Sequence, residues 1–215
     1  MSETASLRLE RAQITDLSSI QHMTGLRALF LTRTPIDDLS AIAALTNLET
    51  LGLRLTRITD LSPLAGLTRL RHLIVSFTEI SDLRPLAGLT ELESCHLTGS
   101  WVSDVSPLAG LVNLTRLDLG GTQVSDIAPL RRLTNLLGLQ LAGTKVKDLA
   151  PIEQMRELRF LDLGDTPVAD ISPLRNLVSL REIDLRGTNV TDVSPLSGLP
   201  GCAIVTATNP RRRRR

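Results

Sequence analysis

Aromatic residues are scarce in this sequence, whose 215 residues include three Phe, one Trp and no Tyr. A folded core must therefore be aliphatic, and leucine alone supplies 43 residues. Apolar residues make up 42% of the chain and charged residues 22%, with the two signs nearly balanced, which excludes a wholly disordered chain. The length allows one large domain or two small ones.

Long apolar runs and a secretory leader are also missing. The apolar runs are only a few residues long, so the sequence predicts no transmembrane segment. Residues 1–5 join no basic region to an apolar stretch, so we expect no secretory signal. The two cysteines, Cys95 and Cys202, are too few for a disulfide framework, and we interpret them as buried thiols of a reducing compartment. The expected location is cytoplasmic.

An internal repeat of 22 residues dominates the chain. Residues 47–68 read NLETLGLRLTRITDLSPLAGLT, and residues 69–90 read RLRHLIVSFTEISDLRPLAGLT. Nine such units fill residues 3–200 without an insertion, and residues 201–208 are predicted to be a capping strand. Numbering each unit from its first residue, the shared pattern is L-x-x-L-x-L-x-x-T-x-[IV]-x-D-[LIV]-x-P-L-x-x-L, beginning at position 2. We predict a single domain over residues 3–208.

Each unit is predicted to contain a strand, a turn and a short helical stretch. Alternating apolar residues at positions 5 and 7 are typical of a strand with one buried face. Ser at position 16 and Pro at position 17, as in Ser62-Pro63, predict an N-cap followed by the first residue of a helix. Only about four residues remain before the next Leu, which leaves room for one 3₁₀ or α turn. Stacked units would bury their leucines as one continuous core.

This pattern resembles the leucine-rich repeat of the internalin type and, more loosely, the phosphatase-regulator type, over about 92% of the chain. The resemblance implies a curved α/β solenoid with a parallel β-sheet on the concave face, short 3₁₀ or α turns on the convex face, and protein binding through the concave face. Where the family usually has Asn at position 10, this chain mostly has Thr, so we expect a weaker hydrogen-bond ladder between repeats. Surface attachment, as in secreted internalins, is not expected.

Aspartate occupies position 14 in all nine units: Asp16, Asp38, Asp60, Asp82, Asp104, Asp126, Asp148, Asp170 and Asp192. Such a column suggests a calcium or acid–base array, but calcium requires about six or more oxygen ligands and no second acidic column accompanies this one. We predict instead that each Asp accepts backbone N–H groups and organises the following turn.

Two histidines and an aspartate are expected close together on the outer face of the sheet. His72, His96 and Asp118 fall on three successive strands, where they would suit zinc or acid–base chemistry. No nucleophile accompanies them, because Cys95 is predicted to point inward. We therefore interpret them as a polar surface in which His96 pairs with Asp118, and predict no metal, no cofactor and no catalysis.

The binding surface is sought at the positions that the repeat leaves free. Positions 4, 6 and 8 point out of the concave face, and position 9 carries Gly in four units but Leu55 and Phe77 in two. Gly52 is expected to leave a dent between Phe30 and Ile74. Exposed apolar residues gather in the first half and acidic ones in the second, which favours a protein interface. The candidate partner-binding residues are Phe30, Arg54, Leu55, His72, Ile74, Phe77, His96, Trp101, Asp118, Phe160, Asp162 and Asp184.

The net charge of +1 conceals a separate basic tail. Without the terminal run Arg211–Arg215, 19 basic residues face 23 acidic ones, a net charge of −4. Residues 209–215 are predicted to be a flexible Arg-rich tail. The primary hypothesis is a non-catalytic protein-binding module, acting as an adaptor, inhibitor or regulatory subunit. The alternative is a binder of nucleic acid or anionic membrane that acts through this tail, with the solenoid as scaffold.

Overall fold

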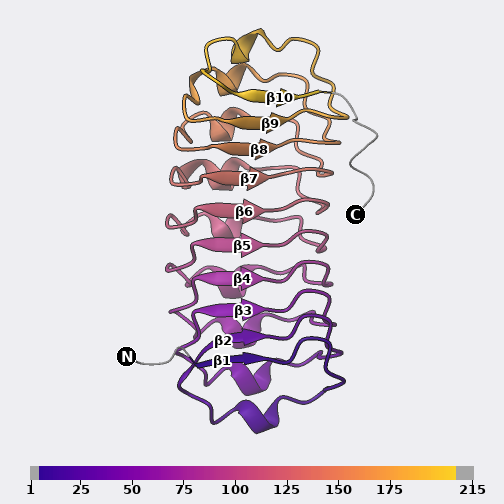
Figure 1. The fold of residues 1–215 in the computed structure, drawn as a ribbon, viewed down its shortest axis with the longest axis vertical. Coiled ribbons are helices and arrows are strands. Elements are labelled where there is room, and N and C mark those ends of the chain that lie inside the picture. Colours follow the sequence, from indigo (N-terminus) through magenta and orange to yellow (C-terminus); the bar gives the residue numbers. More distant parts are fainter. Residues whose placement is uncertain (1–4, 207–215) are drawn as a thin grey trace.

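The computed structural model describes residues 5–206, within which ten parallel strands form one open curved sheet in chain order (Figure 1). The strands are β1 (Ala5–Arg8), β2 (Leu26–Phe30), β3 (Thr50–Gly52), β4 (His72–Ile74), β5 (Ser94–His96), β6 (Arg116–Asp118), β7 (Gly138–Gln140), β8 (Phe160–Asp162), β9 (Glu182–Asp184) and β10 (Ala203–Val205). Because parallel neighbours cannot be joined by a tight hairpin, every connection crosses the opposite side of the solenoid.

The crossing segments contain 3₁₀ helices, which lie behind the sheet in Figure 1. Within the described residues these are η1 (Ser18–Ile20), η2 (Ser40–Ile42), η3 (Ser62–Leu64), η4 (Arg84–Leu86), η5 (Ser106–Leu108), η6 (Ala128–Arg132), η7 (Ala150–Ile152), η8 (Ser172–Asn176) and η9 (Ser194–Leu196). Of the 3₁₀ and α alternatives, every described unit takes the 3₁₀ form. The predicted solenoid, with its parallel sheet and short turns on opposite sides, is confirmed.

The core is a stack of aliphatic side chains between the sheet and the 3₁₀ helices. Strand register advances by one repeat at each step, so Leu51 pairs with Leu73, and Leu73 with Cys95. All three side chains have 0% exposure. Residues of the end units, such as Leu7 and Val190, are only partly buried because a neighbour covers them on one side alone.

The aspartates at position 14 organise the turns, as predicted. In all nine units the Asp Oδ1 accepts the backbone N–H of the residue two positions later, at 2.8 or 2.9 Å. The prediction that Ser62 acts as N-cap was wrong: Leu61 occupies the cap position, Ser62 begins the 3₁₀ helix, and its hydroxyl donates back to Asp60. These hydrogen bonds hold the pKa of Asp60 below its ordinary value.

The threonines at position 10 do not form the expected ladder between repeats. Each hydroxyl donates instead to a carbonyl three residues earlier in its own unit, at 2.6 or 2.7 Å, as Thr122 does to Leu119. Asn at position 1 does bond between repeats: Asn113 Nδ2 donates to the Thr90 carbonyl, and Asn135 Nδ2 to that of Val112. The Thr hydroxyl is used up by this nearby carbonyl of the same unit, so it forms no ladder between repeats.

Two predictions fall partly or wholly beyond the described range. The capping strand is present as β10, but residues 207–208 of its predicted extent and the tail at 209–215 lie outside residues 5–206. Among the described helices, none has the length and apolarity needed to cross a bilayer.

Candidate functional site

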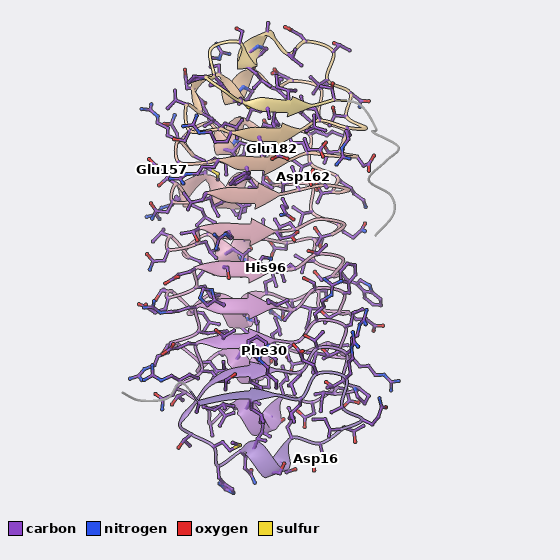
Figure 2. The ribbon with its side chains drawn as sticks, in the orientation of Figure 1. Asp16, Phe30, His96, Glu157, Asp162 and Glu182 are labelled. Atoms are coloured by element: carbon purple, nitrogen blue, oxygen red, sulfur yellow. The ribbon has the colours of Figure 1, made fainter. Side chains whose placement is uncertain are left out.

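The outward side chains at position 6 form one column across the sheet. Strand register places each beside the next, giving the order Arg8, Phe30, Gly52, Ile74, His96, Asp118, Gln140, Asp162 and Asp184. Figure 2 shows Phe30, His96 and Asp162 along the face that is turned toward the viewer. The column changes from basic and apolar at the first strands to acidic at the last.

An arginine and a phenylalanine stack at the first strands. The Arg8 guanidinium lies 4.1 Å from the centroid of the Phe30 ring. The ring rests on Gly52, where an added Cβ would lie 3.0 Å from Phe30 Cδ1. The dent expected at Gly52 is therefore filled by the Phe30 ring, and Gly52 itself is buried. Phe30 is half-buried and offers less free surface than its position in the sequence suggested.

Position 9 has a left-handed backbone in every described unit. Four units place Gly there: Gly99, Gly121, Gly143 and Gly187. Five place a residue with a side chain: Arg11, Arg33, Leu55, Phe77 and Asp165. Leu55 and Phe77 both have φ of 57°, a conformation that costs an L-residue roughly 1–2 kcal/mol. Yet Leu55 is 38% exposed and Phe77 43%, so burial offsets this strain only in part.

Phe77 stands in a small cluster at the end of β4. Its ring rests on Gly99 of the next repeat, where an added Cβ would lie 2.8 Å from Phe77 Cδ1. The Arg54 guanidinium lies 4.6 Å from the ring centroid. Trp101, two residues beyond Gly99, is 60% exposed. We call Arg54, Leu55, Phe77 and Trp101 the first-half patch, and all four belong to the predicted partner-binding set.

The predicted histidine–aspartate cluster is only partly assembled. His96 Nδ1 lies 3.9 Å from Asp118 Oδ2, while His72 Nδ1 lies 3.0 Å from Ser94 Oγ instead. Burial raises the pKa of Asp118, but the contact with His96 and hydrogen bonds from Thr98 and Gly120 outweigh it, so the pKa lies below its ordinary value. No three His, Cys, Asp or Glu side chains within residues 5–206 are arranged to hold a metal ion.

The acidic residues of the last strands differ in how they are paired. Asp184 is nearly buried and forms an ion pair with Arg186, which lowers its pKa against the opposing effect of burial. Burial raises the pKa of Asp162, and the neighbouring Asp184 adds to that effect. Asp162 accepts a hydrogen bond from the Gly164 backbone at 2.9 Å. Its carboxylate is therefore the less neutralised of the two.

Two hollows mark this side of the molecule. One, of about 230 Å³, lies on the concave face and is lined by His96, Arg116, Leu117, Asp118, Leu137, Gly138, Gln140, Arg159 and Phe160. The other, of about 530 Å³, lies at the edge where the strands begin, near Glu157 in Figure 2. In this second hollow, Glu91 and Glu93 are already paired with Arg71. The first hollow unites three predicted residues, His96, Asp118 and Phe160, with side chains that the sequence prediction did not select.

Comparison with known proteins agrees with this geometry. Residues 46–88 match the leucine-rich repeat family, in its two-copy form. The solved structure of an internalin, inlC2, from Listeria monocytogenes is 33% identical, with a TM-score of 0.80, over 83% of this chain and 79% of that one. A second Listeria monocytogenes internalin, inlF, is 28% identical, with a TM-score of 0.80, over 92% of this chain and 72% of that one.

A more distant structure shares the fold alone. The plant peptide hormone receptor RGFR1, solved in complex with RGF2, is 20% identical, with a TM-score of 0.81, over 94% of this chain and 35% of that one. No curated protein sequence matches the chain. The chain therefore belongs to the leucine-rich repeat proteins of the internalin type, as indicated by its 22-residue period, its parallel sheet, its 3₁₀ turns and its likeness to inlC2.

Proposed function

We propose that this chain is a non-catalytic protein-binding module, serving as an adaptor, inhibitor or regulatory subunit in the cytoplasm. Its partner docks on the first half of the concave face and the adjoining rim. The observation that carries the proposal is the left-handed backbone of Leu55 and Phe77, which remain substantially exposed at a position where four units use glycine. Backbone strain at residues that stay partly exposed is typical of functional sites.

The first-half patch has the composition of an interface centre. Large apolar side chains each gain about 1.5–3 kcal/mol on full burial. Leu55, Phe77 and Trp101 are 38%, 43% and 60% exposed, so part of that gain is still open to a partner. Arg54 stacks on Phe77 and forms no ion pair within the described residues, so its N–H groups remain available to a partner. Aromatic residues and arginine are the types that dominate binding energy at protein interfaces.

The acidic half of the face is assigned a secondary role. Asp118, Asp162 and Asp184 lie in the same column as Phe30, so a partner covering the first half would place its own basic groups near them. Because Arg186 neutralises Asp184, Asp162 contributes most to this steering. We expect Asp162→Asn to reduce the salt dependence of association more than Asp184→Asn does, with a small effect on affinity.

The proposal is tested by capturing the partner with the wild-type protein and comparing variants in direct binding. Phe77→Ala combined with Trp101→Ala should weaken binding at least about tenfold, roughly 1.4 kcal/mol, with little change in melting temperature. Val178→Ala, which truncates a side chain 58% exposed at position 22, is the matched control and should bind normally.

Two results would contradict this assignment. Unchanged binding by the Phe77 and Trp101 variant, together with loss on changing Phe160 or Asp162, places the interface in the other half. Salt-sensitive binding that disappears on deleting residues 211–215 assigns it to the tail, with nucleic acid or anionic lipid as the ligand.

A further inference from the structure

The hollow of about 230 Å³ on the concave face exists because one side chain is missing. Strand register places Gly138 of β7 between Arg116 of β6 and Phe160 of β8. All three stand at position 4, and Gly138 is the only glycine at that position in the nine units. A Cβ added to Gly138 would meet no atom within 4 Å, so the space above it is open. We call this feature the Gly138 hollow.

Two arginines of the Gly138 hollow form no ion pair with the described residues. Arg71 and Arg186 form ion pairs with Glu93 and Asp184, at the same sheet surface. Arg116 and Arg159 line the hollow, and neither guanidinium forms an ion pair or a hydrogen bond with any residue in 5–206. Paired arginine N–H groups bind a carboxylate in bidentate geometry, with hydrogen bonds about twice as strong as neutral ones.

The other walls supply an apolar surface and hydrogen-bond acceptors. The Phe160 ring is 54% exposed and lines the hollow from β8. The amide of Gln140 and the carboxylate of Asp118 line it from β7 and β6. Asp118 already accepts hydrogen bonds from Thr98 and Gly120, which fixes its orientation. The hollow therefore offers cationic, apolar and acceptor groups within a space smaller than the roughly 300–1,000 Å³ of drug-sized pockets.

We propose that the Gly138 hollow binds the C-terminal residue of a peptide or protein chain that ends in an apolar amino acid. Its α-carboxylate pairs with Arg116 and Arg159, its side chain lies over Gly138 against Phe160, and its N–H donates to Gln140 or Asp118. A C-terminal residue carries these three groups on one Cα atom, which matches the small size of the site. An internal acidic side chain lacks the adjacent apolar group.

This site stands apart from the first-half patch, because it lies over β5 to β8 and shares no residue with Arg54, Leu55, Phe77 or Trp101. It does not require the partner of the proposed function. A small probe therefore tests it directly, and failure of either proposal leaves the other standing.

The probe is N-acetyl-phenylalanine, titrated to millimolar concentration into the ¹⁵N-labelled full chain and followed by amide chemical shifts. We expect saturable shifts at Gly138, Gln140 and Phe160. The uncharged N-acetyl-phenylalanine amide should bind at least fivefold more weakly. N-acetyl-aspartyl-phenylalanine amide, which supplies a carboxylate from a side chain, should also bind more weakly than the free acid.

Variants then test separately the contribution of the arginine charges and that of the open space over Gly138. Arg116→Gln with Arg159→Gln should abolish the preference for the free acid over its amide, while Arg131→Gln, a charge loss on η6, keeps it. Gly138→Val should block binding of the free acid, because the valine side chain takes up the hollow, and its Cβ meets no atom within 4 Å. Ala28→Val is the matched control at the same repeat position in β2, and should bind as the wild type does.

Three results overturn the proposal: equal binding of the acid and its amide, shifts that cluster away from β6 to β8, or full binding by the Gly138→Val protein. Equal binding of the aspartyl dipeptide amide overturns the assignment to a chain terminus.

Discussion

The phenyl ring of Phe77 rests on the backbone of Gly99, one repeat further along, where an added Cβ would lie 2.8 Å from ring carbon Cδ1. Both residues stand at position 9 and both have a left-handed backbone, with φ of 57° and 65°. The Phe77 ring thus occupies the space that a side chain at residue 99 would need. The contact lies where position 9 changes along the solenoid: the first four units carry a side chain there, and the later units mostly carry glycine.

Replacing Gly99 tests that contact. Gly99→Ala should destabilise the fold by at least about 1 kcal/mol, because alanine at positive φ is strained and its methyl group meets the Phe77 ring. Chemical denaturation measures the change. Gly110→Ala, where an added Cβ meets nothing within 4 Å, should cost little. Combining Gly99→Ala with Phe77→Gly should recover part of the loss, and no recovery would show that the ring does not rest there.

Ser100 offers an opportunity to stabilise the protein. It is 2% exposed and takes the place of threonine at position 10, but its hydroxyl has no hydrogen-bond partner within the described residues. The threonines of seven other units donate to the carbonyl three residues earlier, so Ser100→Thr should form this bond with Leu97. We expect a gain of about 0.5–1.5 kcal/mol in the free energy of unfolding. A loss of stability on denaturation would mean that the extra methyl group does not fit.

The aspartates at position 14 make stability depend on acid pH. Hydrogen bonds from Ser62 lower the pKa of Asp60 in the folded chain below the ordinary 3.8. Its contribution to stability is therefore complete above pH 3.8 and is lost as the pH falls through the lower, folded value. Asp60→Ala should be less stable than the wild type at pH 7, and denaturation at a series of pH values should show the gap narrowing below about pH 4. The Asp37 carboxylate caps none of the described turns, so the difference in stability between Asp37→Ala and the wild type should stay small at every pH.

The two cysteines should differ in reactivity and should not join. Cys95 is fully buried, and burial raises the pKa of its thiol to about 12, whereas Cys202 is only partly buried. At pH 8, a thiol reagent should label Cys202 in the native protein and Cys95 only after unfolding. Five strand spacings place the two about 24 Å apart, against the roughly 7 Å that a disulfide allows. A 95–202 disulfide in a non-reducing mass spectrum would contradict the linear stack of repeats.

The fold was predictable because one 22-residue pattern specifies both the strand and the turn, and register follows from identical spacing. Local hydrogen bonding was less predictable. Consensus at a position shows that a residue is used, but not which acceptor its side chain reaches. The Thr122 hydroxyl, for example, donates to a carbonyl of its own unit. The Ser62 hydroxyl donates to Asp60 and does not cap the turn itself.

The candidate site was only partly predictable for a related reason. The sequence singled out Leu55 and Phe77 by their departure from glycine, but their strained backbone became evident only in three dimensions. Gly138 could have been found as the lone glycine at position 4. Arg159, at position 3, could not, because its presence at the hollow depends on the direction its side chain takes across the sheet.

The central claim, that Leu55 and Phe77 are kept for binding rather than folding, is tested most directly by Leu55→Gly combined with Phe77→Gly. Glycine relieves roughly 1–2 kcal/mol of strain at each position, which offsets the lost side-chain contacts. The free energy of unfolding should therefore stay level or rise, while affinity for the captured partner falls at least about tenfold. Asp165→Gly, the same exchange at the same repeat position in the other half, should leave binding intact. Full affinity in the double variant, or unfolding of the protein by these two changes, would contradict the account.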